Sequence, residues 1–171
     1  MEKSLGVANC MLRIAILDDN PLTNMKLQKL LYFAHGWNLA FYDEPLVDKT
    51  VQAWRYGPVI PDVYMKFRSY GTNIITRPYK GLRYSEQEEE YKVYEPSIKD
   101  RERTLQLLKR TWSAYGIYSG DELSQMTHVK DSPWKIMWTK YSGVLDIEIP
   151  DDLIKDYFKG LMKKGLMKNR K

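Results

Sequence analysis

The sequence predicts a predominantly α-helical domain of the α+β class, with a small antiparallel β-ribbon and several helices packed around one central, buried helix. Most segments repeat apolar residues at the spacing of a helix that buries one face. The segment from Thr23 to about Phe41 is apolar around most of its circumference, which is typical of a helix packed on several sides. Only residues 50–56 and 90–95 resemble short strands, because β-branched and aromatic residues are concentrated there.

The first half of the chain is expected to hold three helices and one strand. A helix over residues 4–17 has one apolar face and ends at the turn-forming run Asp18-Asp19-Asn20-Pro21. The hydroxyl of Thr23 can accept a free backbone N–H at the start of the central helix. The pair Gly57-Pro58 ends the first strand, and a helix over about 61–69 follows, with a proline in its first turn.

The middle of the chain has the weakest pattern. Residues 72–90 contain a proline, a glycine and the acidic run 86–90, and we expect this segment to be irregular. The segment 90–95 is expected to pair with 50–56 as the antiparallel ribbon. A two-stranded ribbon is only marginally stable alone, so it has to pack against the helices.

Four further helices are expected toward the C-terminus. One begins at Asp100, and the next begins at Ser119, where a glutamate three residues later completes a capping-box pattern. Another begins at Ser132, which is followed by a proline suited to the first turn. The last helix begins at Asp151-Asp152, and its acidic start and lysine-rich end both match the helix dipole.

The length and charge favour one intracellular domain over residues 1–171, with a basic tail from about residue 163. The net charge is +5, and the last nine residues hold five basic residues and no acidic one, so the remainder is nearly neutral. The basic balance therefore gives little support to nucleic-acid binding. No apolar run is long enough for a membrane span, and the N-terminus lacks the pattern of a signal peptide. With a single cysteine, Cys10, these features predict a cytoplasmic protein.

No catalytic motif is found in the sequence. Phosphate-binding glycine loops, the GxSxG elbow and the CxxC and HExxH metal motifs are all absent. The two histidines have structural explanations: His35 lies inside the central helix, and His128 follows a predicted helix as a cap or an interface residue. We therefore expect no catalytic residues, no metal, no cofactor and no enzymatic activity.

Four segments together resemble the SocA-like, or Panacea, domain, a family that includes the phage-associated GepA proteins. They are Thr23–Trp37 (TNMKLQKLLYFAHGW), Ala53–Tyr64 (AWRYGPVIPDVY), Phe67–Gly71 (FRSYG) and Leu123–Trp134 (LSQMTHVKDSPW). The resemblance implies a bacterial or phage antitoxin that neutralises a protein toxin encoded beside it. It implies direct contact, either masking the toxin or presenting it to a protease, and it does not identify the toxin.

The resembling segments supply four candidate partner-binding residues: Arg55, Tyr56, His128 and Trp134. Strand alternation places Arg55 and Tyr56 on opposite faces, so one of them is expected to point outward. Each candidate also has a structural alternative, such as core packing for Trp134. A nucleic-acid-associated repressor is the less favoured function, and it would use the basic tail and the mixed aromatic and basic loop over 77–84.

Overall fold

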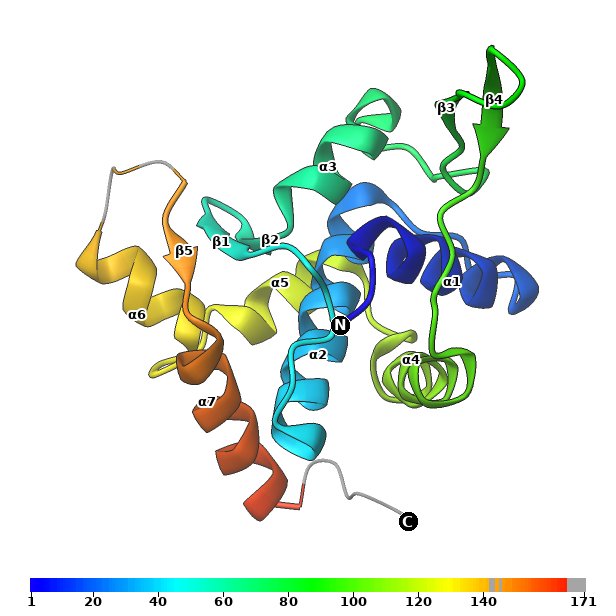
Figure 1. Cartoon of the computed structure of the whole chain (residues 1–171). Helices are drawn as coiled ribbons and strands as arrows, with labels where there is room; N and C mark the ends of the chain where they lie inside the picture. Colours follow the sequence, from blue (N-terminus) through cyan, green and yellow to red (C-terminus); the bar gives the residue numbers. More distant parts are fainter. Residues whose placement is uncertain (142–143, 145, 166–171) are drawn as a thin grey trace.

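The computed structural model describes residues 1–141, 144 and 146–165 (Figure 1), and these residues confirm the predicted fold class. They form seven α-helices, one short 3₁₀ helix and five short strands. The helices are α1 (Ser4–Leu17), α2 (Asn24–Tyr42), α3 (Pro61–Phe67), α4 (Arg101–Tyr115), α5 (Gly120–Thr127), α6 (Pro133–Lys140) and α7 (Asp151–Lys163), with the 3₁₀ helix at Arg68–Tyr70. The strands are β1 (Val51–Trp54), β2 (Gly57–Val59), β3 (Gly81–Ser85), β4 (Glu90–Tyr94) and β5 (Glu148–Ile149).

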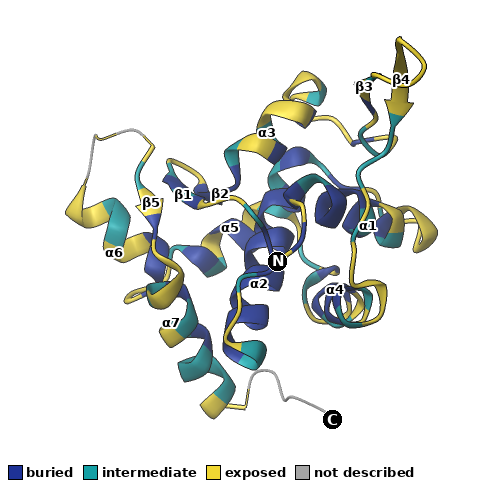
Figure 2. Cartoon of the chain, in the orientation of Figure 1, coloured by how far each residue is buried: buried dark blue, intermediate teal, exposed yellow. Residues whose placement is uncertain are grey.

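Helix α2 is the centre of the fold, as predicted. Every residue from 26 to 40 is buried, and α1, α3, α4, α5, α7 and β2 all pack against it (Figure 2). The helix begins where expected, because the Thr23 hydroxyl accepts a hydrogen bond from the Lys26 amide at 3.3 Å. It ends at Asp43, which adopts a left-handed conformation.

The most extensive helix packing joins α2 to α7. Phe158 of α7 is fully buried, and its ring meets the rings of Tyr32 and Trp37 edge to face. Gly36 makes this approach possible, since a Cβ atom there would lie 2.3 Å from the Phe158 ring. Burying an aromatic side chain of this size contributes about 2–3 kcal/mol, so the contact fixes α7 firmly on the central helix.

The strands pair differently from the prediction. Strand β1 pairs with β2 and with β5, and β3 pairs with β4 in a separate hairpin, so the expected ribbon between 50–56 and 90–95 is wrong. Each of these two strands finds a partner nearby in the chain, because a short loop closes at a smaller entropic cost than a long one. Residues 72–90, expected to be irregular, therefore contribute a strand at 81–85.

The predicted helix starts toward the C-terminus are confirmed. The Asp100 and Ser132 side chains both cap helices, and the capping box between Ser119 and Glu122 is complete. None of the helices in the described residues is long and apolar enough to cross a membrane. Helix α7 ends at Lys163, and residues 166–171 of the expected basic tail lie outside the described residues.

Candidate partner-binding site

The structure brings the four candidate residues together around one tight turn. Arg55 and Tyr56 are the two residues that connect β1 to β2. Helix α5 reaches the turn through the Ser124 hydroxyl, which donates to the Tyr56 carbonyl at 2.8 Å. Helix α6 reaches it through the Trp134 indole, which donates to the Trp54 carbonyl at 2.8 Å. His128 lies between the two helices, with its ring 3.7 Å from that of Trp134.

The turn exposes both of its side chains, which corrects the expectation that only one of them points outward. Tyr56 is 65% exposed, and the exposed Arg55 guanidinium lies 5.5 Å from the Tyr56 ring. Strand alternation does not apply to them because they form the turn itself. Trp134, predicted as a partner-binding residue with core packing as its alternative, is 2% exposed and packs in the core, and His128 is half-buried as the C-cap of α5.

Two buried polar residues of the central helix hold the turn from below. Gln28 and Lys29 are each 1% exposed. The Gln28 side-chain carbonyl accepts from the Ile60 amide at 2.9 Å, and the Lys29 ammonium donates to the Pro58 carbonyl at 3.1 Å. Sequence reasoning missed both residues. The signal available was a pair of long polar residues within an otherwise apolar stretch, because such residues are buried only when they are hydrogen-bonded.

Lys29 is the most perturbed cation near the turn. Burial lowers the pKa of its ammonium to about 7, because removal from water disfavours the charged form. Gly57 lies directly over the end of the Lys29 side chain. Its φ is +106°, and a Cβ atom added to it would lie 2.8 Å from Lys29 Cε. The backbone at Gly57 is therefore fixed by both its conformation and its contacts.

The loop between α5 and α6 is ordered by its own hydrogen bonds. The Thr127 hydroxyl donates to the Ser124 carbonyl at 2.7 Å, and the Ser132 hydroxyl donates to the Thr127 carbonyl at 2.7 Å. The Nδ1 atom of His128 is hydrogen-bonded to the same Ser124 carbonyl. These bonds fix the two helices that support the Arg55–Tyr56 turn, so the turn is held from three sides.

Elsewhere, the described residues show little that suits catalysis. They contain no group of three or more histidine, cysteine, aspartate or glutamate side chains placed to hold a metal ion. His35 is paired with Asp151, with Nε2 and Oδ1 2.9 Å apart. Burial raises the pKa of the Cys10 thiol, which disfavours the reactive thiolate.

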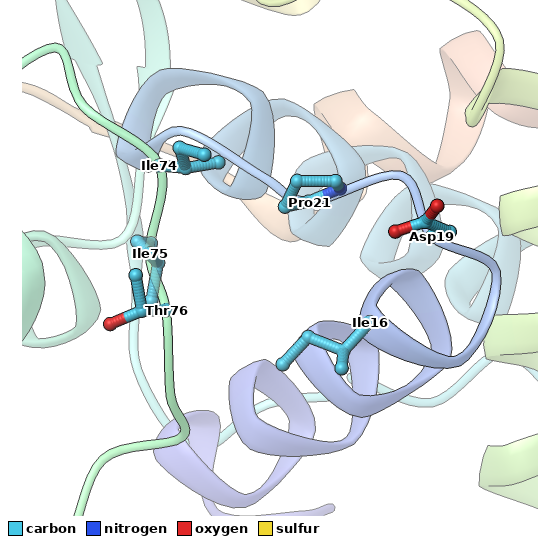
Figure 3. A pocket seen from close by; sticks show the side chains of 6 residues that line it. All are labelled: Ile16, Asp19, Pro21, Ile74, Ile75 and Thr76. Carbon is cyan, nitrogen blue, oxygen red and sulfur yellow. The ribbon is translucent and has the colours of Figure 1, made fainter.

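A small pocket of about 220 Å³ lies between the end of α1 and the segment 74–76 (Figure 3). Its lining is mostly aliphatic, and Asp19 is its single carboxylate. The lining residues are Ile16, Asp19, Pro21, Ile74, Ile75 and Thr76. One carboxylate without a second titratable group gives this pocket no pair for acid–base chemistry.

Comparison with known proteins agrees with the resemblance found in the sequence. Residues 27–135 match the family described as "Antitoxin SocA-like, Panacea domain", a range that includes the turn, Gln28, Lys29, His128 and Trp134. The chain is also 34% identical over 163 residues to "Antitoxin SocA" of Caulobacter vibrioides (strain NA1000 / CB15N), which covers 90% of this chain and 81% of that protein. No solved structure matches the chain significantly. On the strength of the domain match and this relative, the chain belongs to the SocA-like Panacea family of antitoxins.

Proposed function

We propose that this protein is a cytoplasmic antitoxin without catalytic activity, which neutralises a protein toxin by direct contact through the Arg55–Tyr56 turn. The observation that carries the proposal is an exposed tyrosine and arginine on a turn held from three sides by buried polar and aromatic groups. Tyrosine and arginine are enriched among the residues that dominate binding energy. A turn that is already rigid loses little conformational entropy on binding, so more of the contact energy appears as affinity.

The four candidate residues take two different roles in this proposal. Arg55 and Tyr56 contact the toxin, since their side chains are exposed. Trp134 and His128 position the turn, Trp134 through its bond to the Trp54 carbonyl and His128 through its contact with the Trp134 ring. A standard interface of about 1,600 Å² extends well beyond two side chains, so neighbouring parts of α5 and α6 are included in the contact.

Neutralisation can follow from such a contact by two routes. Bound antitoxin either covers the surface that the toxin uses, or presents the toxin to a protease as an adaptor. The half-life of the toxin in cells separates the routes, because masking leaves the toxin intact whereas an adaptor shortens its half-life. We favour masking, because it requires only the contact itself.

The proposal is tested by co-expressing the protein with the product of the neighbouring gene. Wild-type protein should restore growth and form a stoichiometric complex. The variants Arg55→Ala and Tyr56→Ala should weaken that complex tenfold or more without a change in melting temperature, because both side chains are exposed. The matched controls Arg101→Ala and Ile117→Ala remove exposed side chains on and after α4, and should bind as wild type.

Trp134→Phe tests the positioning role separately. It keeps an aromatic ring in the core but removes the hydrogen bond to the Trp54 carbonyl, so it should weaken the complex while most of the stability remains. Toxin binding that is unchanged in both turn variants would refute the proposed contact. Neutralisation without any complex would refute direct binding as the mechanism.

A further inference from the structure

The β3–β4 hairpin has an apolar face that no other part of the described chain covers. It projects from the body at a distance from the Arg55–Tyr56 turn (Figure 1). Its register pairs Leu82 with Val93 and Tyr84 with Tyr91, so all four side chains lie on the same face. Their exposed fractions are 66%, 66%, 49% and 70% respectively, and most of the hairpin is exposed (Figure 2). A contiguous row of large apolar side chains in water is typical of a binding surface.

The hairpin is anchored to the body at its base, which fixes the direction of this apolar face. Asn9 of α1 is 2% exposed, and its side chain bonds to both ends of the hairpin. Its amide donates to the Tyr79 carbonyl at 2.9 Å and to the Pro96 carbonyl at 3.1 Å, and its oxygen accepts from the Tyr79 amide at 2.8 Å. Gly81 packs beneath the Tyr94 ring, where a Cβ atom would lie 2.6 Å from it. The apolar face is therefore presented in a defined orientation.

A positively charged cleft of about 780 Å³ continues this surface at the base of the hairpin. Val93 belongs to both the apolar row and the cleft. The cleft is lined by Arg13, Lys66, Phe67, Ser69, Tyr70, Arg77, Pro78, Tyr79, Lys80, Val93 and Glu95. Its one carboxylate, Glu95, is paired with Arg13. Among the described residues, no carboxylate forms a salt bridge with the three remaining cations, so the cleft has an uncompensated positive charge beside the apolar row.

We propose that the apolar face of the β3–β4 hairpin and the adjoining cleft form a second docking surface, which binds an extended, acidic segment of a protein. Apolar side chains of the segment cover the row formed by β3 and β4, and its carboxylates pair with Lys66, Arg77 and Lys80. An extended segment fits because each strand of this hairpin has only one neighbour among the described residues, which leaves backbone groups along both outer edges. This surface is additional to the toxin contact at the Arg55–Tyr56 turn.

The chemistry of the surface favours a protein segment over nucleic acid or a second copy of this chain. Half of the apolar row, Leu82 and Val93, is aliphatic and offers nothing that stacks on a base, whereas apolar side chains of a protein segment can cover all four members of the row. In a symmetric dimer through this face, the same cations would approach one another across the two-fold axis. An acidic protein segment satisfies both the apolar row and the positive charge.

A selection of peptides tests the proposal on the full chain. A phage-displayed library of random twelve-residue peptides is selected on wild-type protein and counter-selected on the Leu82→Ser/Tyr91→Ser double variant. Because both side chains are exposed, this variant should fold normally, as circular dichroism and melting can verify. The enriched peptides should combine apolar and acidic residues. Synthetic versions should bind at least tenfold more weakly to that variant and to Arg77→Glu/Lys80→Glu, and normally to Arg83→Ser/Lys92→Ser, which alters the opposite face.

Five results would overturn the proposal, four of them in binding measurements without the toxin. In the selection, two of these four are enrichment of no peptide whose binding depends on the row, and enrichment of peptides without acidic residues. The others are a twelve-nucleotide thymidine strand that binds more tightly than the peptides at the same residues, and self-association of wild-type protein that the double variant abolishes. Parallel measurement of toxin binding separates this idea from the proposed function. The hairpin variants should bind toxin normally, whereas Arg55→Ala and Tyr56→Ala should bind the peptides normally. Loss of toxin binding in the hairpin variants would assign this surface to the toxin contact and refute a second site.

Discussion

Replacing the buried Lys29 with methionine should make the protein more stable at low pH and less stable at high pH. Methionine has a similar length and no charge, so it fills the same space below the Arg55–Tyr56 turn. The change removes two opposing contributions. One is the cost of burying an ammonium group, and the other is the hydrogen bond from that ammonium to the Pro58 carbonyl at 3.1 Å.

The magnitude follows from the lysine pKa, which burial lowers from 10.5 to about 7. Between these values the unfolded chain keeps a proton that the folded chain has released, so the free energy of unfolding rises with pH across this window. At about 1.4 kcal/mol per pH unit, burying the ammonium costs about 4–5 kcal/mol at pH 6.5 and about 1–2 kcal/mol at pH 9.5. Leaving the Pro58 carbonyl without its donor costs about 1–3 kcal/mol at either pH.

The balance predicts that Lys29→Met gains about 2 kcal/mol at pH 6.5 and loses about 1 kcal/mol at pH 9.5. Urea unfolding of wild type and variant at several pH values measures this difference, in which the titration of other groups cancels. Lys26→Met is the matched control, because Lys26 is also buried but its ammonium donates to two oxygens. The difference in unfolding free energy between wild type and Lys26→Met should therefore change less between pH 6.5 and pH 9.5. A difference between wild type and Lys29→Met that stays constant from pH 6.5 to 9.5 would refute the assigned burial of the charge.

Two further substitutions test the geometry around the turn and the central helix. Gly57→Ala should lower the free energy of unfolding by about 2–5 kcal/mol, because the added Cβ is strained at this positive φ and also clashes with Lys29. Gly71→Ala, whose added Cβ is strained but has no neighbour within 4 Å, should lower it less in the same urea titration. Asp151→Ala should cost about 1–3 kcal/mol by leaving the buried His35 without its acceptor. Asp152→Ala, which removes an exposed carboxylate that pairs with Lys155 and lies in the first turn of α7, should cost under about 1 kcal/mol, and equal losses in both would contradict the role of the His35 pair.

The buried polar residues of α2 explain what the family's sequence segments do physically. Lys29 belongs to the segment Thr23–Trp37, the turn to Ala53–Tyr64, and Trp134 to Leu123–Trp134. In the structure these three segments meet, because the first and the third each donate a hydrogen bond to backbone carbonyls on either side of the turn. Their common product is an exposed arginine and tyrosine on a fixed backbone. A scattered set of sequence matches is therefore one structural unit.

The sequence by itself determined the elements whose signals are local. Helix caps at Thr23, Ser119 and Ser132 could be predicted because a side chain three residues away from its partner amide needs no distant contact. The central position of α2 could be predicted as well, because only a helix packed on several sides tolerates apolar residues around its circumference. The family resemblance pointed to the turn and to α5 and α6, although it could not distinguish contact residues from support.

Only the tertiary structure decided which groups meet. Residue patterns indicate that a strand or helix has a buried face, but they do not encode what that face packs against, so β1 and β4 were assigned to each other instead of to their nearby partners. The same limit hid the role of Lys29, since the polar group that makes its burial tolerable is a carbonyl 29 residues away in sequence. It also hid the apolar face of β3 and β4, because exposure depends on the absence of a covering element. Burial and pairing are properties of the assembled fold, and they divided the candidate residues into those that face solvent and those that hold them in place.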